Sequence, residues 1–194
     1  MRDDGKIRRM PNRRQATVED LYREEQRAEI VGGELVLMPE SGGLPAYAAG
    51  EIFVSLRQYA RRTGSGYALP EPGFVVRLPN RLSFSPDVAF TTTRLLTGKF
   101  IEGAPILAVE VRSDTDYDGL TAERAMAAKR ADYFAAGTIV VWDVDVLQRQ
   151  IVRVYRAGNP FMPTVYRRGQ QAEAEPALPG WSMPVDGLFP ATQR

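Results

Sequence analysis

The sequence predicts one α/β domain, and three observations support this fold class. Apolar residues recur at helical spacing over residues 46–61. A strand, a helix and a second strand follow one another between Ile106 and Val144, an order typical of a βαβ unit with neighbouring parallel strands. The 194 residues are 44% hydrophobic and 25% charged, which suits a chain with a single folded core.

The first residues differ in character from the rest of the chain. Residues 1–15 carry six basic side chains around Pro11 and show no apolar periodicity. We therefore expect a flexible basic arm over residues 1–15 and a single domain over residues 16–194. A solvated tail is the simpler interpretation of this arm, and a phosphate-contacting arm is the alternative.

Two short elements are expected at the start of the domain. Thr17 and Asp20 resemble a capping box, with Asp in place of Glu, and predict a helix over residues 18–25. Apolar residues alternate on both sides of a Gly-Gly pair within residues 28–39, which predicts two strands joined by a tight turn. Glu29 lies on the first of these strands.

The middle of the chain begins with the long helix over residues 46–61, which a glycine- and serine-rich stretch ends. Residues 67–82 are predicted to be strand material interrupted by prolines. A short apolar strand is expected over residues 84–91, with Asp87 near its start, and a polar connection over residues 92–103.

A buried strand, a helix and another strand follow. Residues 105–112 form an almost continuous apolar run, typical of a strand covered on both faces, and Glu110 interrupts it. Residues 121–136 are rich in helix formers and end at Gly137, which predicts a helix with a glycine C-cap. A strand is expected over residues 138–144.

The last part of the chain continues with strands. Residues 150–156 alternate strictly, a turn is predicted at 158–160, and a further strand is expected near Val165. A proline-rich segment closes the chain.

Composition removes whole classes of chemistry. The chain has no cysteine and no histidine, so thiolate nucleophiles, imidazole bases and the usual zinc sites are excluded. Carboxylate, lysine, tyrosine and hydroxyl groups remain, with Mg²⁺ or Mn²⁺ as the natural metal. No apolar run is long enough to span a membrane, and the amino terminus does not resemble a secretory signal, so we expect a cytoplasmic protein.

Charged side chains in apolar segments are the candidate functional residues. Asp87 begins one strand, Glu110 lies inside another, and Lys129 lies on the helix between two strands. A buried carboxylate needs an ion pair, hydrogen bonds or a metal. Arg112 shares a strand face with Glu110, and Lys129 shares a helical arc with Tyr133, so both cations are possible partners of Glu110.

These residues resemble a known signature. Pro86-Asp87, followed by Glu110 with a basic residue two positions later, is similar to the PD-(D/E)XK signature of restriction-endonuclease-like nucleases. Within that group the chain resembles the Uma-two family over about residues 29–189. The similar segments are 28–38, 85–90, 109–113, Lys129 with 133–137, and 141–144.

The resemblance implies a restriction-endonuclease-like core in which helices flank a mixed central sheet. It also implies that Asp87 and Glu110 bind Mg²⁺ or Mn²⁺, with Glu29 as a further acid at the metal. The signature lysine is expected to be Lys129, which would orient or activate water. Arg112 holds the strand position of that lysine and would stabilise transition-state charge, because an arginine stays protonated and cannot serve as a base.

The function implied by the resemblance is a metal-dependent endonuclease that hydrolyses DNA phosphodiester bonds, with a homodimer expected because both strands would be cut. The chain departs from the family at Pro45, near the place where members often carry a histidine. The departure bears on any histidine-assisted step and on activity itself.

Two other functions stay open at this stage. One is a catalytically inactive module on the same fold that binds nucleic acid or protein. The other is a carboxylate-pair hydrolase acting on sugars, which would need a groove lined with aromatic residues, and Trp142 and Trp181 are poorly placed to form one.

Simpler structural roles also remain for individual residues. Glu110 could be held by an ion pair alone, Lys129 could extend its stem along the helix to water, and Glu29 could be a locally paired strand residue. The acidic run at 114–118 lacks the glycine and distal glutamate of an EF-hand and is interpreted as a solvated turn.

Overall fold

The computed structural model describes residues 15–93, 96–117 and 119–191, so the expected basic arm lies outside the described residues except for Gln15. A six-stranded sheet forms the central layer. Its strands are β3 (Tyr67–Pro70), β6 (Val88–Thr91), β8 (Leu107–Val111), β9 (Val140–Asp145), β10 (Ile151–Arg156) and β11 (Asn159–Arg167).

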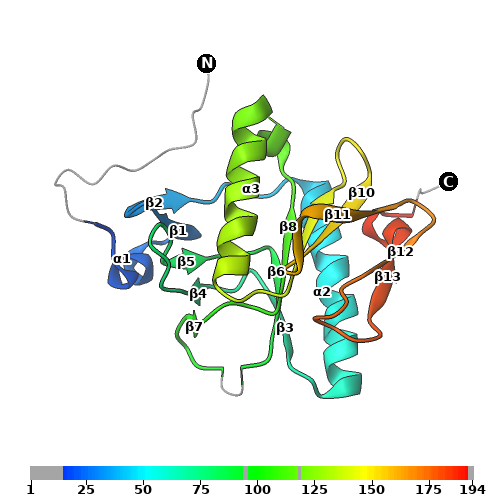
Figure 1. The fold of residues 1–194 in the computed structure, drawn as a ribbon, viewed down its shortest axis with the longest axis horizontal. Coiled ribbons are helices and arrows are strands. Elements are labelled where there is room, and N and C mark those ends of the chain that lie inside the picture. The colour runs from blue at the N-terminus through cyan, green and yellow to red at the C-terminus, as the bar shows by residue number, and fades with distance from the viewer. Residues whose placement is uncertain (1–14, 94–95, 118, 192–194) are drawn as a thin grey trace.

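The order of these strands across the sheet is β11-β10-β9-β8-β6-β3 (Figure 1). β8 and β9 are parallel, and the other neighbours are antiparallel. The sheet is therefore mixed, and the parallel pair confirms the strand–helix–strand unit expected between Ile106 and Val144. β3 and β11 are its two edges.

Two helices cover opposite faces of the sheet, as the separate apolar clusters on the two faces show. α2 (Gly43–Thr63) buries Ile52 and Leu56 against the face that carries Trp142. α3 (Gly119–Ala135), in front of the sheet in Figure 1, buries Tyr133 against the other face. The long helix predicted over residues 46–61 is confirmed, and it begins earlier because proline is tolerated in a first turn.

The parallel strand β8 shows how the sequence sorts the two faces. Leu107, Val109 and Val111 belong to the core on the α2 side. Ala108 belongs to the core on the α3 side, and Glu110 contacts residues of α3. A strand covered on both faces can therefore place one carboxylate under a helix.

A smaller layer adjoins the α3 side. The predicted helix and hairpin near the start of the domain are confirmed as α1 (Val18–Arg23), β1 (Ala28–Val31) and β2 (Glu34–Leu37), and Asp20 caps α1 by accepting hydrogen bonds from Thr17. A three-stranded sheet lies beside the hairpin. It contains β4 (Phe74–Val75), β5 (Ser83–Phe84) and β7 (Ile101–Glu102).

Three expectations about strands were wrong. The single strand over residues 84–91 is two strands, β5 and β6, in different sheets, and Pro86, which has no N–H to donate, lies at the bend between them. The polar connection over residues 92–103 contains β7. The predicted turn residues Asn159 and Pro160 begin β11, because an edge strand tolerates proline.

The chain ends on the α2 side. Strands β12 (Gln171–Glu173) and β13 (Ser182–Pro184) and the 3-10 helix η2 (Val185–Leu188) contribute to the core under α2. The acidic run forms a second 3-10 helix, η1 (Asp114–Tyr117), while Asp118 lies outside the described residues.

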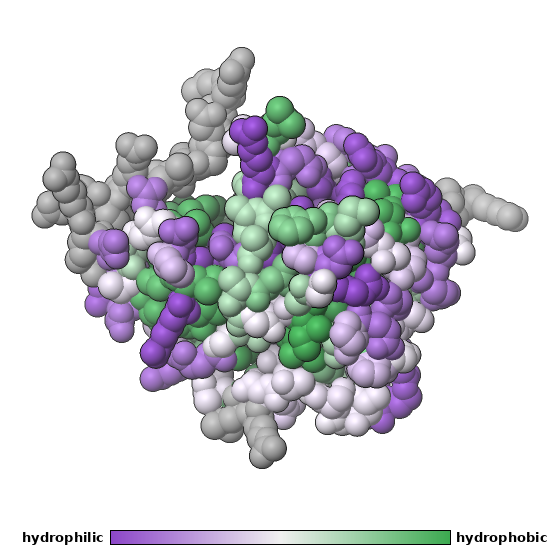
Figure 2. Space-filling view, in the orientation of Figure 1, coloured by the Kyte–Doolittle hydropathy of each residue, from purple (hydrophilic) through white to green (hydrophobic). Residues whose placement is uncertain are grey.

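The surface on the α3 side mixes charged and apolar side chains instead of presenting one apolar area (Figure 2). Within the described residues, no helix combines the length and the apolar character needed to cross a membrane.

Candidate active site

Lys129 of α3 lies at the centre of the candidate site. Its ammonium nitrogen is 2.9 Å from Glu29 Oε1 and 2.9 Å from Glu110 Oε2. The three side chains come from a helix, a hairpin and the parallel strand β8, and each is at most 16% exposed. Folding therefore brings together three of the residues that the sequence singled out.

Asp87 lines the same cleft from the position directly before β6, the strand next to β8. The cleft has a volume of about 540 Å³, and both Asp87 and Glu110 line it. The backbone N–H of Val111 donates to Asp87 Oδ2 at 2.8 Å, which fixes the carboxylate beside β8. Asp87 Oδ1 is 3.5 Å from the Arg27 guanidinium, which also donates to Glu71 at 2.8 Å.

Glu29 is held on every side by donors. Its Oε1 accepts the Ser85 N–H at 2.8 Å as well as the Lys129 contact, and Arg81 bonds its Oε2. Arg81 also reaches Asp132 on α3 at 2.8 Å, so one buried guanidinium ties the hairpin to the helix that carries Lys129. Although burial opposes it, the neighbouring Lys129 and Arg81 lower the pKa of Glu29.

Glu110 has the opposite electrostatic environment. Burial, together with the nearby negative charges of Asp87 and Glu29, raises the pKa of Glu110 to about 7, despite the opposing effect of Lys129. The Tyr133 hydroxyl donates to Glu110 Oε1 at 2.7 Å. Burial also raises the pKa of Asp87. Negative charge at this end of the cleft is therefore only partly neutralised by the protein.

Arg112 belongs to a different group of charges. Its guanidinium donates to Asp143 at 2.7 and 2.8 Å and also bonds Glu123, and only 2% of the side chain is exposed. Arg112 lines the cleft, but within the described residues all hydrogen bonds of its guanidinium go to these two carboxylates and none to Asp87 or Glu110. The bidentate pair with Asp143 compensates for the burial of this arginine under the helix.

Sequence reasoning missed Arg27 and Arg81, and it named Tyr133 only as a residue on the same helical arc as Lys129. Tyr133 is fully buried, and its hydroxyl reaches Glu110. Arg81 directly follows Pro79-Asn80, a turn signal, and its neighbours do not mark it as a buried cation. Nothing in the sequence around Arg27 predicts its contact with Asp87.

The carboxylates fit a hard divalent cation in part. Among the described residues, no three acidic side chains form a metal-binding group. Mg²⁺, however, commonly uses one or two protein carboxylates and completes its shell with water and substrate oxygens. Asp87 and Glu110 provide two such carboxylates, and their raised pKa values indicate charge that a cation would offset. Glu29 is occupied by cations and the Ser85 N–H, which leaves it poorly placed as a third ligand.

An aromatic-lined groove for sugars is not present at this site. Trp142 and Trp181 are buried in the α2-side core, with ring centroids 4.9 Å apart. Tyr133 is the one aromatic residue among those lining the cleft in the described structure. The sugar-hydrolase alternative therefore loses the groove that it requires.

Comparison with known proteins places the chain among nuclease-like folds. The structure is similar to the crystal structure of a putative nuclease belonging to DUF820 from Anabaena variabilis, with a TM-score of 0.70 and 17% sequence identity over 90% of this chain and 97% of the other. At that identity the likeness shows the fold. No curated protein matches the chain. The profile of the Uma2 family, described as putative restriction endonuclease, matches residues 16–186. That match covers most of the sequence, and the chain belongs to the Uma2 family.

Proposed function

We propose that the protein is a metal-dependent endonuclease that hydrolyses phosphodiester bonds in DNA. The observation that carries this proposal is that Asp87, which directly precedes β6, and Glu110, on the adjacent strand β8, line one cleft, with Lys129 bonded to Glu110. The family description and the nuclease-like neighbour support the same reaction class.

Asp87 and Glu110 would hold a single Mg²⁺ or Mn²⁺ ion. When bound, such an ion polarises a phosphoryl oxygen and lowers the pKa of a coordinated water. The Val111 N–H holds Asp87 Oδ2, which leaves Oδ1 directed into the cleft near Arg27. The Tyr133 hydroxyl and Lys129 each hold one oxygen of Glu110, so its orientation is set before any ligand arrives.

Lys129 serves as a fixed positive charge in this proposal. Burial alone would lower its pKa, but Glu110 and Glu29 outweigh that effect and raise the pKa of Lys129, so it stays protonated and is not a base. An ammonium group has three N–H donors, and two of them meet Glu29 and Glu110. The third donor is available to a substrate oxygen on which negative charge builds.

The substrate and the assembly are inferred from the same reaction class. We expect DNA as the substrate, because the family is described as putative restriction endonuclease. A homodimer is expected, since two copies of the site would be needed to cut both strands together.

Plasmid cleavage tests the proposal. Purified full-length protein is incubated with supercoiled plasmid in Mg²⁺, in Mn²⁺ and in EDTA, and nicked and linear products are followed by gel electrophoresis. Scission is expected with either metal and not in EDTA. Asp87→Asn and Glu110→Gln should each reduce the rate by about a thousandfold, because each removes a group that stabilises the transition state.

Glu102→Gln is the matched control, since Glu102 is an exposed acid on β7 outside the cleft. It should cleave like the wild type. Binding of the plasmid by the protein without scission in either metal would contradict the proposal and favour an inactive binding module. Undiminished cleavage by Asp87→Asn would show that the reaction occurs elsewhere.

A further inference from the structure

A second concave surface lies on the α2 side of the sheet, between α2 and the edge strand β3. We call it the α2/β3 groove. It has a volume of about 860 Å³, and the exposed side chains of Arg57, Arg61 and Tyr67 line it. None of its lining residues is acidic. The groove therefore presents positive charge along a free strand edge.

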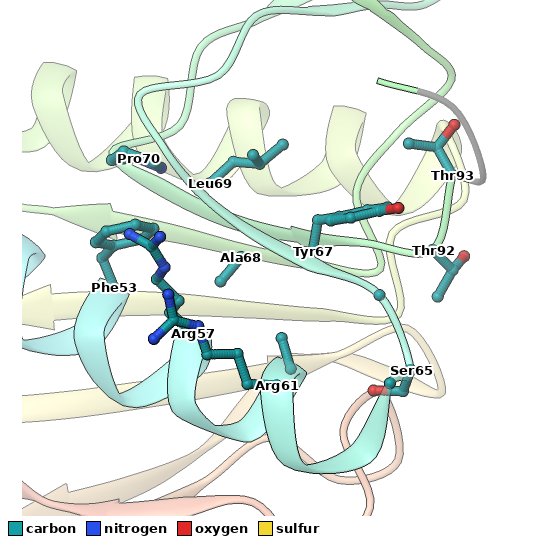
Figure 3. A pocket seen from close by; sticks show the side chains of 13 residues that line it. Phe53, Arg57, Arg61, Ser65, Tyr67, Ala68, Leu69, Pro70, Thr92 and Thr93 are labelled. Atoms are coloured by element: carbon teal, nitrogen blue, oxygen red, sulfur yellow. The ribbon is translucent and has the colours of Figure 1, made fainter. Parts of the chain in front are cut away.

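The two arginines are free to bind a ligand. Within the described part of the chain, neither Arg57 nor Arg61 forms an ion pair. Figure 3 shows the Arg57 guanidinium beside the Phe53 ring, with its centre 5.8 Å from that ring, and Arg61 on the next turn of α2. They lie one helical turn apart, about 6 Å along the axis. This arrangement suits two successive negative groups of an extended ligand.

Aromatic and hydroxyl groups complete the groove. Tyr67 is 42% exposed and extends from β3 toward the end at which Thr92 and Thr93 lie (Figure 3). Grooves that combine cations with an exposed aromatic ring are typical of surfaces that bind single-stranded nucleic acid, where phosphates meet the cations and bases stack on the ring.

The β3 end of the groove is connected to the candidate active site through the backbone. Pro70 lines the groove, and it pairs with Val88 at the start of β6. The next residue, Glu71, donates its N–H to the Asp87 carbonyl at 2.9 Å and accepts a hydrogen bond from Arg27 at 2.8 Å. The Arg27 contact offsets the negative charge of Glu71 at this junction. A nucleic-acid strand that leaves the candidate site at Asp87 could thus continue along β3.

We propose that the α2/β3 groove binds one strand of the nucleic acid next to the point of cleavage, through Arg57, Arg61 and Tyr67. This inference rests on the proposed function, because it takes a phosphodiester polymer as the ligand. An acidic peptide added to the edge of β3 would be the competing partner. The neighbouring candidate site for phosphodiester hydrolysis favours the nucleic acid.

Binding without cleavage tests this proposal. Fluorescence anisotropy of a labelled DNA duplex with a single-stranded extension is measured in EDTA, over roughly 50 to 300 mM salt. The variant Arg57→Ala with Arg61→Ala should reduce the slope of log affinity against log salt by about 1.4, since each single-strand phosphate contact contributes about 0.7. Tyr67→Ala should weaken binding by at least about fivefold and leave the slope unchanged.

The matched control is Arg149→Ala with Arg167→Ala, which removes two exposed arginines away from the groove. It should leave the slope unchanged, and all variants should keep the wild-type circular dichroism spectrum and melting temperature. Wild-type affinity and slope in the groove variant would overturn the groove proposal, as would an equal effect of the control.

The outcome also separates this proposal from the proposed function. Metal-dependent cleavage by the wild type, combined with an unaffected groove variant, would overturn only the groove. A wild-type protein that neither binds nor cleaves DNA would overturn both.

Discussion

Two groups of charged side chains lie near α3, one centred on Glu110 and the other on Arg112, two residues later in the chain. The groups differ in how well their positive and negative charges are matched. In the Arg112 group, three arginines face three carboxylates. Its members are Arg112, Arg130, Arg153, Glu123, Asp143 and Asp145.

The Glu110 group has fewer cations than acids. Five carboxylates face three cations, and two of those cations are shared with acids at the margin. Its members are Glu29, Glu71, Asp87, Glu110, Asp132, Arg27, Arg81 and Lys129.

The pKa values reflect this difference. Hydrogen bonding from Arg112 lowers the pKa of Glu123, whereas burial raises that of Glu110. Charges that are matched within the protein can be buried without a ligand, while an unmatched buried carboxylate is poised to bind a cation. The first group is therefore structural, and the second is the candidate site.

The largest expected effect is on catalysis. Replacing Lys129 with Met should slow plasmid cleavage by about a thousandfold, because the substitution removes the ammonium group that we propose faces the developing charge. The matched control is Arg130→Met, the next residue on α3, whose guanidinium lies 3.4 Å from Asp143 in the other group. Arg130→Met should cleave at a rate close to that of the wild type, and an equal loss in both variants would erase the distinction between the groups.

The next effect is on stability. Arg112→Met should lower the free energy of unfolding by about 3 kcal/mol, since it leaves the buried Asp143 without its bidentate partner. Denaturant titration followed by circular dichroism measures the change, with the exposed Arg167→Met as the control. A stable Arg112→Met protein that had lost only its cleavage activity would instead assign Arg112 to the reaction.

A pH experiment compares the sign of the stability change with pH in the two groups. The folded-state pKa of Glu110 is about 7 against an ordinary 4.5, so its protonated form favours the fold, and this contribution is lost as the pH rises toward 7. In EDTA, Glu110→Gln should therefore gain stability over the wild type between about pH 5 and about pH 8, by on the order of 2 kcal/mol.

Glu123→Gln should show the opposite sign. The lowered pKa of Glu123 means that its ionised form favours the fold, so its stabilising contribution is present above pH 4.5 and is lost as the pH falls through the lowered value. The variant should be less stable than the wild type near neutral pH and approach it in acid. Differences of the same sign for both glutamates would contradict the comparison.

The smallest effect concerns one hydroxyl group. Tyr133→Phe should lower the free energy of unfolding by about 1 kcal/mol, because Glu110 loses a buried hydrogen bond. That bond lowers the pKa of Glu110, so the pH at which the Glu110 carboxyl titrates should rise in the variant. Tyr155→Phe, beside Arg130 in the other group, is the control and should change stability little.

Much of the fold could be predicted from local patterns. Periodicity identified α2, the helix-forming residues before Gly137 identified α3, and the apolar run of β8 indicated a strand covered on both faces. Such signals depend only on neighbouring residues. The boundary between β5 and β6 was missed, since nothing in the local pattern shows that the chain changes sheets at Pro86.

Only part of the candidate site was predicted from the sequence. Glu110 and Lys129 were singled out as partners, and they are in contact. Arg112 was grouped with them because it shares a strand face with Glu110. The strand register, however, places Asp143 of β9 opposite Glu110, within reach of the Arg112 guanidinium. Arg81 was missed, because its partners Glu29 and Asp132 are about fifty residues away on either side.

The sequence by itself determined which groups were available: carboxylates and lysine, without imidazole or thiol, and one acid inside a buried strand. Tertiary structure decided which charges meet and which are left unmatched. The physical reason is that the cost of burying a charge depends on the distance to its partners, and those partners come from a hairpin, a helix and neighbouring strands that are far apart in the chain.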